Sequence, residues 1–189
     1  MEVIPKNKLS HSTQKTIHGL KTYLDRSIYY YGSVLRPDYV DGESDVDILV
    51  FSDNIDSTLS QICQYLRVDR DDVKKTIWHL NQAHLIHGYK LQYSDANKHV
   101  NIEISVFNER NQKEIIDDHL SVLSLPAYIL YLLYIVKFLH YRLHLISKPM
   151  YNILKRFIMG EMMGRYDENN RFFMYTPRGV GNSPQRGAQ

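Results

Sequence analysis

The chain has 189 residues, of which 43% are hydrophobic and 23% are charged, and its formal net charge is +2. These proportions exclude a disordered, collagen-like or coiled-coil chain and leave room for a buried core. The single cysteine, Cys63, excludes an intramolecular disulfide and a cysteine-based zinc site. A lone thiol favours a reducing compartment, so we expect a cytoplasmic protein with no disulfide partner.

Neither a secretory signal nor a membrane span is expected. Residues 1–14 lack the apolar core of a signal peptide. The longest uncharged stretch, residues 121–136, contains Pro126 and falls short of the roughly 20 apolar residues that cross a bilayer. We therefore expect a buried helix there and no contact with a membrane.

The small net charge hides an asymmetry along the chain. Residues 1–136 carry 14 Lys and Arg against 18 Asp and Glu, whereas residues 137–189 carry 9 against 3. A basic C-terminal third can meet a polyanion such as a nucleic acid. A solvated basic surface explains the same asymmetry equally well.

Hydrophobic periodicity predicts the elements of the first half in chain order. Residues 12–26 have the 3-and-4 spacing of an amphipathic helix, with Ser12 or Thr13 as its N-cap. Residues 28–31 are β-prone and end at Gly32. Residues 45–51 alternate as a strand, with Asp45 and Asp47 on one face and apolar residues on the other.

Helices and a hairpin are expected next. Residues 57–66 and 71–85 have helical spacing, and residues 86–93 and 99–107 form two strands around the polar turn 94–98. Three further helices are expected: 111–123, one that reaches about residue 145, and one after Pro149 that reaches about residue 164.

This order of elements indicates an α+β fold with a C-terminal helical appendage. We expect a core at 1–108, a helical region at 109–165 and an irregular, partly disordered basic tail at 166–189.

Three acidic residues are the candidates for chemistry. Asp45 and Asp47 are two residues apart on a strand, so their side chains lie next to each other. Two ionised carboxylates ~4 Å apart repel by about 4 kcal/mol at an effective dielectric of 20. A hard divalent cation such as Mg²⁺ relieves this repulsion, and Glu103 on the polar face of a later strand is a third possible ligand.

Gly32 and Ser33 supply the complementary half of a site. Glycine has no Cβ, so a phosphate can approach its backbone closely. If a helix begins just after Ser33, its first N–H groups and the hydroxyl point at that phosphate. Metal-bound carboxylates beside such a cradle are the parts needed for two-metal nucleotidyl transfer.

The segment Tyr29–Phe51, YYYGSVLRPDYVDGESDVDILVF, resembles the nucleotidyltransferase superfold of DNA polymerase β and the minimal nucleotidyltransferases. The resemblance implies a small mixed sheet flanked by helices, an NTP substrate and Mg²⁺ or Mn²⁺ as the cofactor. It further implies that Gly32 and Ser33 bind the nucleotide's phosphates, that Asp45 and Asp47 hold both metals, and that Glu103 is the third ligand and orients the acceptor hydroxyl as general base. Two departures are the long loop 36–42 and Glu103 in place of the more usual Asp.

Two other functions fit parts of the sequence. Residues 57–105 also have the pattern of a winged helix, with 71–86 as its recognition helix and the hairpin as its wing. That interpretation leaves Asp45 and Asp47 unexplained, and Asp71 and Asp72 would repel DNA. A nucleotide-binding relative that has lost catalysis is the other possibility. The acceptor stays open among a nucleic-acid end, a protein and a small molecule.

Overall fold

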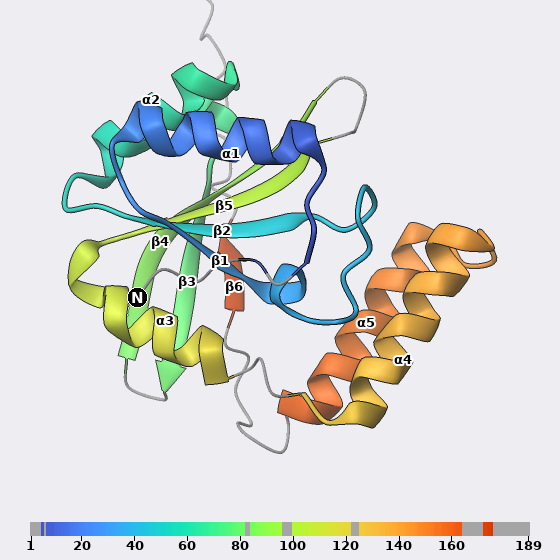
Figure 1. The fold of residues 1–189 in the computed structure, drawn as a ribbon. Helices are drawn as coiled ribbons and strands as arrows, with labels where there is room; N and C mark the ends of the chain where they lie inside the picture. Colours follow the sequence, from blue (N-terminus) through green and yellow to red (C-terminus); the bar gives the residue numbers. More distant parts are fainter. Residues whose placement is uncertain are drawn as a thin grey trace, which may run out of the picture.

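A six-stranded mixed sheet forms the centre of the chain (Figure 1). The computed structural model describes residues 5, 7–81, 84–95, 100–121, 125–163 and 172–175. Neighbouring strands follow the order β1, β2, β5, β4, β3 and β6, with β2 and β5 parallel and the other described pairs antiparallel. The strands are β1 Ile28–Tyr31, β2 Val46–Phe51, β3 Lys74–Asn81, β4 His84–Ser94, β5 Asn101–Phe107 and β6 Phe172–Tyr175.

Helices cover both faces of this sheet, and a further pair extends beside it (Figure 1). Helices α1 and α2 lie on one face, α3 lies on the other, and α4 and α5 form the pair at the side. The α-helices are α1 His11–Leu24, α2 Ile55–Leu66, α3 Gln112–Ser121, α4 Ala127–Lys137 and α5 Lys148–Met163. Short 3₁₀ helices are η1 Gly32–Leu35, η2 Arg70–Asp72 and η3 Glu109–Asn111, and a π-helical turn, η4 Phe138–Arg142, follows α4.

Helix α1 forms where the sequence predicts it but begins earlier. Its N-cap is Ser10, whose Oγ accepts a hydrogen bond from the Thr13 backbone N–H at 3.2 Å. The expected caps Ser12 and Thr13 are therefore wrong, because Ser10 already satisfies the first free N–H group. The helix buries Ile17, Leu20 and Leu24 and ends at Asp25 in the left-handed conformation.

The alternation of β2 divides the core between the two faces of the sheet. Val46, Ile48 and Val50 pack with α1 and α2 in the larger core. Leu49 and Phe51 point the other way and pack with Ile115 of α3. Asp47 shares the face of Leu49 and Phe51, as predicted from the strand's period of two.

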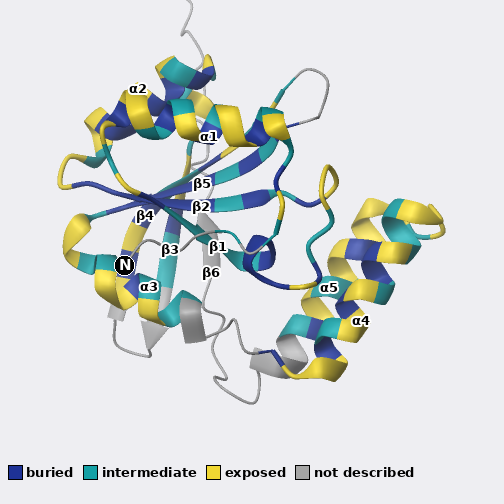
Figure 2. Cartoon of the chain, viewed as in Figure 1, coloured by how far each residue is buried: buried dark blue, intermediate teal, exposed yellow. Residues whose placement is uncertain are grey.

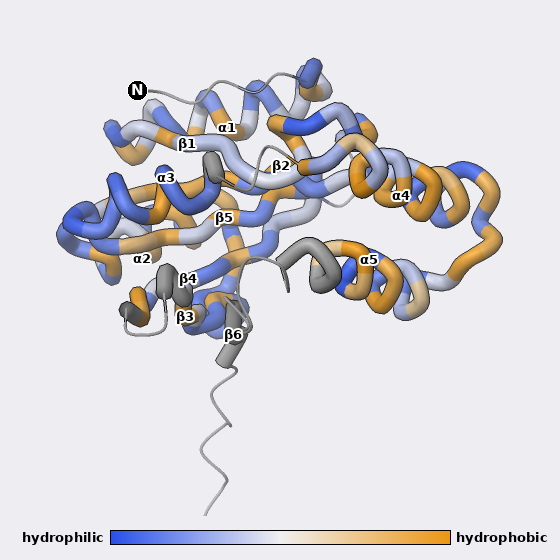
Figure 3. Tube along the Cα trace, turned by 90° about the horizontal axis from the view of Figure 1, so that it is seen from below, coloured by the Kyte–Doolittle hydropathy of each residue, from blue (hydrophilic) through white to orange (hydrophobic). Residues whose placement is uncertain are grey.

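Residues 125–163, which include α4 and α5, form a helical hairpin that has its own small core. Its buried residues are Leu125, Ile129, Leu133, Val136, Tyr151 and Ile158. Figure 2 shows these buried positions between exposed ones along both helices. Hydrophobic residues recur along both helices (Figure 3). Some of the large apolar side chains are not in this core, since Tyr131, Ile153 and Phe157 are more than half exposed.

The largest error of the sequence analysis is the expected helix 71–85. Only Arg70–Asp72 make a helical turn, capped by Asp69, and the chain then runs as strand β3 between β4 and β6. Val73, Thr76 and Ile77 are β-branched, and such residues favour an extended backbone when neighbouring strands pair with them. The winged-helix hypothesis fails with this helix, because its recognition helix is a strand inside the sheet.

The C-terminal half also differs from the expectation. Three helices form as expected, but α4 ends at Lys137 and continues only as the π-helical turn η4 to Arg142, and α5 begins at Lys148, before Pro149. Residues 172–175, expected to be irregular, pair with β3 as β6. The rest of the expected tail 166–189 lies outside the described residues, as do residues 96–98 of the expected turn. The division at residues 108 and 165 stays a prediction, and α3 itself packs on the sheet.

In the described ranges, no helix combines the length and the apolar character that crossing a membrane requires. The uncharged stretch 121–136 includes most of α4, which contributes Ile129 and Leu133 to the core of the helical hairpin.

Truncation of the buried Ile104 tests the core. Ile104 is fully buried between the sheet and its helices, so Ile104→Ala should lower the free energy of unfolding by about 2–5 kcal/mol. Ile153→Ala makes the same change at a side chain that is 61% exposed and should cost no more than about 0.5 kcal/mol. Urea unfolding measures both, and equal losses would contradict the described core.

Candidate active site

A row of three polar side chains crosses neighbouring strands at one end of the sheet. Tyr31 of β1 is paired with Asp47 of β2, and Asp47 is paired with Glu103 of β5. Residues paired across strands share a face, so the three side chains lie next to one another. A register slip of one residue would turn Glu103 to the opposite face, so the parallel pairing of β2 with β5 decides whether this site exists.

Asp45, the residue before β2, completes an acidic cluster. One carboxylate oxygen from each of Asp45, Asp47 and Glu103 lies within 4.8 Å of the others, and all three residues are half-buried. At this separation each ionised pair repels by about 3–4 kcal/mol at an effective dielectric of 20. A donor set made only of carboxylate oxygens fits Mg²⁺ or Mn²⁺, which prefer such ligands and would offset the repulsion.

Burial and mutual repulsion change the protonation of this cluster. Burial, with the charges of Asp45 and Glu103, raises the pKa of Asp47 well above its usual range. Burial and the charges of Asp47 and Glu103 likewise raise the pKa of Tyr31. Burial and the nearby acids, Asp41 foremost, raise the pKa of Tyr39 to about 12. The site therefore has a concentrated negative potential that favours a bound cation.

Contacts on two sides hold the Glu103 carboxylate in place. Lys90 of β4 places its Nζ 2.5 Å from Glu103 Oε1. The Tyr31 hydroxyl donates to the same oxygen at 3.4 Å and lies 3.2 Å from Ser105 Oγ. These groups orient the carboxylate toward the aspartates. The positive charges of Lys155 on α5 and of Lys90 also reach Asp47, where they oppose the rise of its pKa.

Gly32 and Ser33 form the corner between β1 and η1, directly beside Asp47. Gly32 has φ +71°, in the left-handed region where glycine is favoured. A Cβ at Gly32 would collide with the Asp47 carboxylate, so this position requires glycine for space as well as for conformation. Ser33 is buried in the first turn of η1. The helix expected just after Ser33 is a 3₁₀ turn, η1, that begins earlier and contains the Gly-Ser pair itself.

The structure thus brings together all five residues singled out in the sequence. Asp45, Asp47 and Glu103 form one cluster, and Gly32 lies against Asp47 with Ser33 next to it. Their roles as metal ligands, general base and phosphate contacts stay predictions. Sequence reasoning missed Tyr31, Lys90 and Lys155. The position of Tyr31 at the end of the strand before the Gly-Ser pair was the available signal, whereas Lys90 required the register of the hairpin.

A mixed sheet that carries three clustered carboxylates beside a glycine-serine corner defines a nucleotidyltransferase-like protein, which confirms the resemblance seen in the sequence. The chain belongs to the nucleotidyltransferase domain family, whose model matches residues 14–151. The matched range contains all five site residues, the whole of α4 and the first residues of α5.

Solved structures that resemble this chain include two RNA terminal transferases. One is a cytoplasmic RNA terminal U-transferase, with 20% sequence identity and a TM-score of 0.40 over 74% of this chain and 44% of the other. The second is the RNA terminal uridylyl transferase Cid1, with 22% identity and a TM-score of 0.39 over 71% of this chain and 43% of the other. The chain thus spans less than half the length of either structure. No similar sequence is found among curated proteins.

The raised pKa of Asp47 predicts how its removal affects stability. The folded chain keeps the Asp47 proton to higher pH than the unfolded chain, so metal-free wild type loses stability as pH rises from about 3.9 to the folded pKa. Asp47→Asn does not titrate, so it should match wild type near pH 4 and become the more stable of the two as pH rises. Urea unfolding in EDTA measures the difference, with Asp53→Asn, at an exposed acid, as the control for the substitution itself. A constant difference across this pH range would contradict the assignment.

Gly32→Ala tests the fit between the corner and the acids. Its Cβ would displace the Asp47 carboxylate, so the affinity for Mn²⁺ should fall by about tenfold or more. Gly42→Ala is the matched control, because Gly42 also has positive φ, +78°, but its Cβ would meet no atom within 4 Å. Both variants should lose about 1–2 kcal/mol of stability from backbone strain. Calorimetric titration with Mn²⁺ separates them, and equal affinities would refute the described contact.

Proposed function

We propose that this chain is a divalent-metal-dependent nucleotidyltransferase that transfers an NMP from an NTP to a hydroxyl acceptor and releases pyrophosphate. The observation that carries the proposal is the convergence of Asp45, Asp47 and Glu103 within 4.8 Å beside the Gly32–Ser33 corner. Membership in the nucleotidyltransferase domain family supports the reaction class.

In the proposed reaction, the acceptor oxygen forms a new bond to the α-phosphorus. The bond between that phosphorus and the oxygen bridging to the β-phosphorus breaks, and pyrophosphate leaves with the bond's electron pair. The acceptor's proton passes to a base, and Glu103 is the carboxylate proposed for this role. Mg²⁺ or Mn²⁺, held by Asp45, Asp47 and Glu103, would neutralise phosphate charge and polarise the acceptor hydroxyl.

The chain's own groups bind and orient the nucleotide in this proposal. The backbone at Gly32 and the first turn of η1 at Ser33 offer N–H groups and a hydroxyl to the phosphates. Lys155 of α5 lies close enough to Asp47 to affect its pKa, which suits a cation that faces the triphosphate from the helical hairpin. The reaction offers the protein little covalent chemistry to assist. Positioning of the reactants and stabilisation of charge therefore supply most of the rate enhancement.

A nucleic-acid end is the acceptor that the helical hairpin favours. Residues 125–160 contain five Lys and Arg and no acidic residue. Tyr128, Tyr131 and Tyr134 of α4 and Phe157 of α5 are each more than half exposed. Bases stack on exposed aromatic rings, and a basic surface attracts the phosphate backbone.

Incubation of the protein with each α-³²P NTP and Mn²⁺ tests the proposal, with RNA, DNA, protein and small-molecule hydroxyl acceptors offered separately. Asp45→Asn and Asp47→Asn should each lower the rate of labelling by at least about a hundredfold. Asp41→Asn, at an exposed acid in the loop that precedes Asp45, should keep the wild-type rate.

Other outcomes would point elsewhere. Wild-type labelling by Asp47→Asn would show that the catalytic assignment is wrong. A wild-type protein that binds NTP and Mn²⁺ but labels none of the acceptors would be the inactive nucleotide-binding relative. Labelling of a protein or small molecule, but of neither nucleic acid, would overturn the proposed acceptor alone.

A further inference from the structure

A buried ionic cluster lies in the loop that joins the two halves of the site. Residues 36–45 lead from η1, which begins at Gly32, to Asp45, the residue before β2. Within this loop Arg36 donates from Nε to Asp38 Oδ1 at 2.8 Å and from Nη2 to Asp38 Oδ2 at 3.2 Å. Arg36 is 7% exposed and Asp38 is 2% exposed, so both charges are removed from water.

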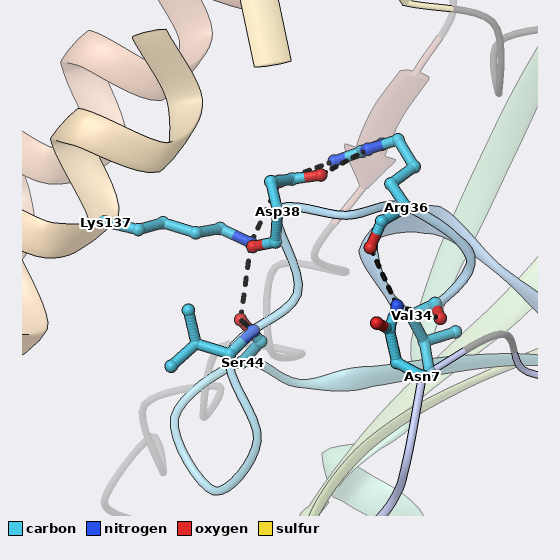
Figure 4. A network of polar contacts seen from close by, with 7 residues as sticks. Asn7, Val34, Arg36, Asp38, Ser44 and Lys137 are labelled. Atoms are coloured by element: carbon cyan, nitrogen blue, oxygen red, sulfur yellow. Dashed lines mark hydrogen bonds and ion pairs between the residues drawn. The ribbon is translucent and has the colours of Figure 1, made fainter. Parts of the chain in front are cut away.

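Lys137, at the last residue of α4, is the third member of this cluster (Figure 4). Its Nζ lies 3.0 Å from Asp38 Oδ2 and donates to the Asp38 backbone oxygen at 2.7 Å and to Ser44 Oγ at 3.3 Å. Lys137 is 3% exposed. An ammonium group has three N–H donors, and here three oxygens surround it. The lysine is therefore committed to the loop and has no donor left for a phosphate.

The contact of Lys137 with Ser44 connects Lys137 to the acidic cluster, and further hydrogen bonds fix Ser44 within the loop. Ser44 donates its backbone N–H to Val40 O at 2.8 Å, and its Oγ accepts the Val40 N–H at 3.2 Å. Asn7 secures the other end through its side-chain amide, which donates to the backbone oxygens of Val34 and Arg36. Ser44 directly precedes Asp45. A displacement of Ser44 would therefore displace Asp45 relative to Asp47.

The charges favour a specific role over a general contribution to stability. Arg36 and Asp38 already form a two-bond pair without Lys137, and burial lowers the pKa of Lys137 although Asp38 opposes this. Bringing a second cation to one carboxylate costs desolvation energy, and replacing buried ion clusters by apolar groups is often neutral or stabilising. What Lys137 adds to the Arg36–Asp38 pair is therefore a connection between α4 and Ser44, the residue before Asp45.

We propose that Lys137 is a positioning residue that holds Asp38 and Ser44, and through them Asp45, in the geometry that binds the metal, and that it fixes the helical hairpin to the same loop. This inference rests on the proposed function, in which Asp45 is a metal ligand. The hairpin and the acidic cluster then form one unit, because a change in the position of α4 is transmitted to Asp45.

Lys137→Met tests the proposal, with Lys113→Met at an exposed lysine of α3 as the matched control. Three measurements apply: Mn²⁺ affinity by calorimetry, hydrogen exchange of the Ser44 backbone N–H, and kcat and KM for the NTP. Lys137→Met should bind Mn²⁺ about tenfold more weakly, exchange the Ser44 proton faster and lose kcat by a similar factor, with KM within about twofold. Lys113→Met should match wild type in Mn²⁺ affinity and in exchange.

A second variant keeps the test decisive if Lys137→Met does not fold. Ser44→Ala leaves the Lys137–Asp38 contacts and removes the hydroxyl that accepts from Lys137 and from the Val40 N–H, so its Mn²⁺ affinity should fall several-fold in a folded protein. Wild-type Mn²⁺ affinity in both variants, or in Ser44→Ala alone if Lys137→Met does not fold, would overturn the proposal. A raised KM with unchanged Mn²⁺ affinity and kcat would also overturn it, because Lys137 would then contact the nucleotide.

The Mn²⁺ and exchange measurements separate this inference from the proposed function. If wild type transfers no nucleotide but Lys137→Met still weakens Mn²⁺ binding and speeds exchange, the positioning role stands and the catalytic proposal fails. If wild type binds no Mn²⁺, Asp45 is not a metal ligand and the positioning role fails as well.

Discussion

Repulsion among three carboxylates is the constraint around which the rest of this molecule is arranged. Asp45, Asp47 and Glu103 lie within 4.8 Å of one another, and burial strengthens the effect of their charges. The sheet tolerates this because β2 and β5 are held by apolar cores on both faces. A rigid mount of this kind keeps acids together that a flexible chain would separate.

Three lysines from β4, α4 and α5 bring positive charge to the region of the cluster. Lys90 contacts Glu103 directly, and Lys155 acts on Asp47 from α5. The contacts of Lys137 are with Asp38 and Ser44 of the loop, not with the three clustered acids. The three lysines therefore differ in what they do, although each is a cation near one site.

Local patterns made much of the site predictable, and long-range pairing accounts for what they missed. The period of two in β2 places Asp45 and Asp47 on one face, and the Gly-Ser pair after a β-prone run indicates the corner at Gly32. The adjacency of Glu103 to Asp47 required the parallel pairing of strands far apart in sequence, which only the family resemblance supplied. Strand β3 was mistaken for a helix because Val73, Ile77 and Leu80 also fit helical spacing. The contact of Lys137 with Asp38 spans 99 residues and has no local signal.

The parallel pairing of β2 and β5 also fixes when the site can form during synthesis. Residues 52–100 separate the two strands and include α2 and the hairpin that carries Lys90. Contacts of such sequence separation close a large loop and form slowly compared with local ones. A nascent chain that has left the ribosome only as far as β4 carries both aspartates but lacks Glu103. The three acids can therefore come together only after β5 has emerged and docked.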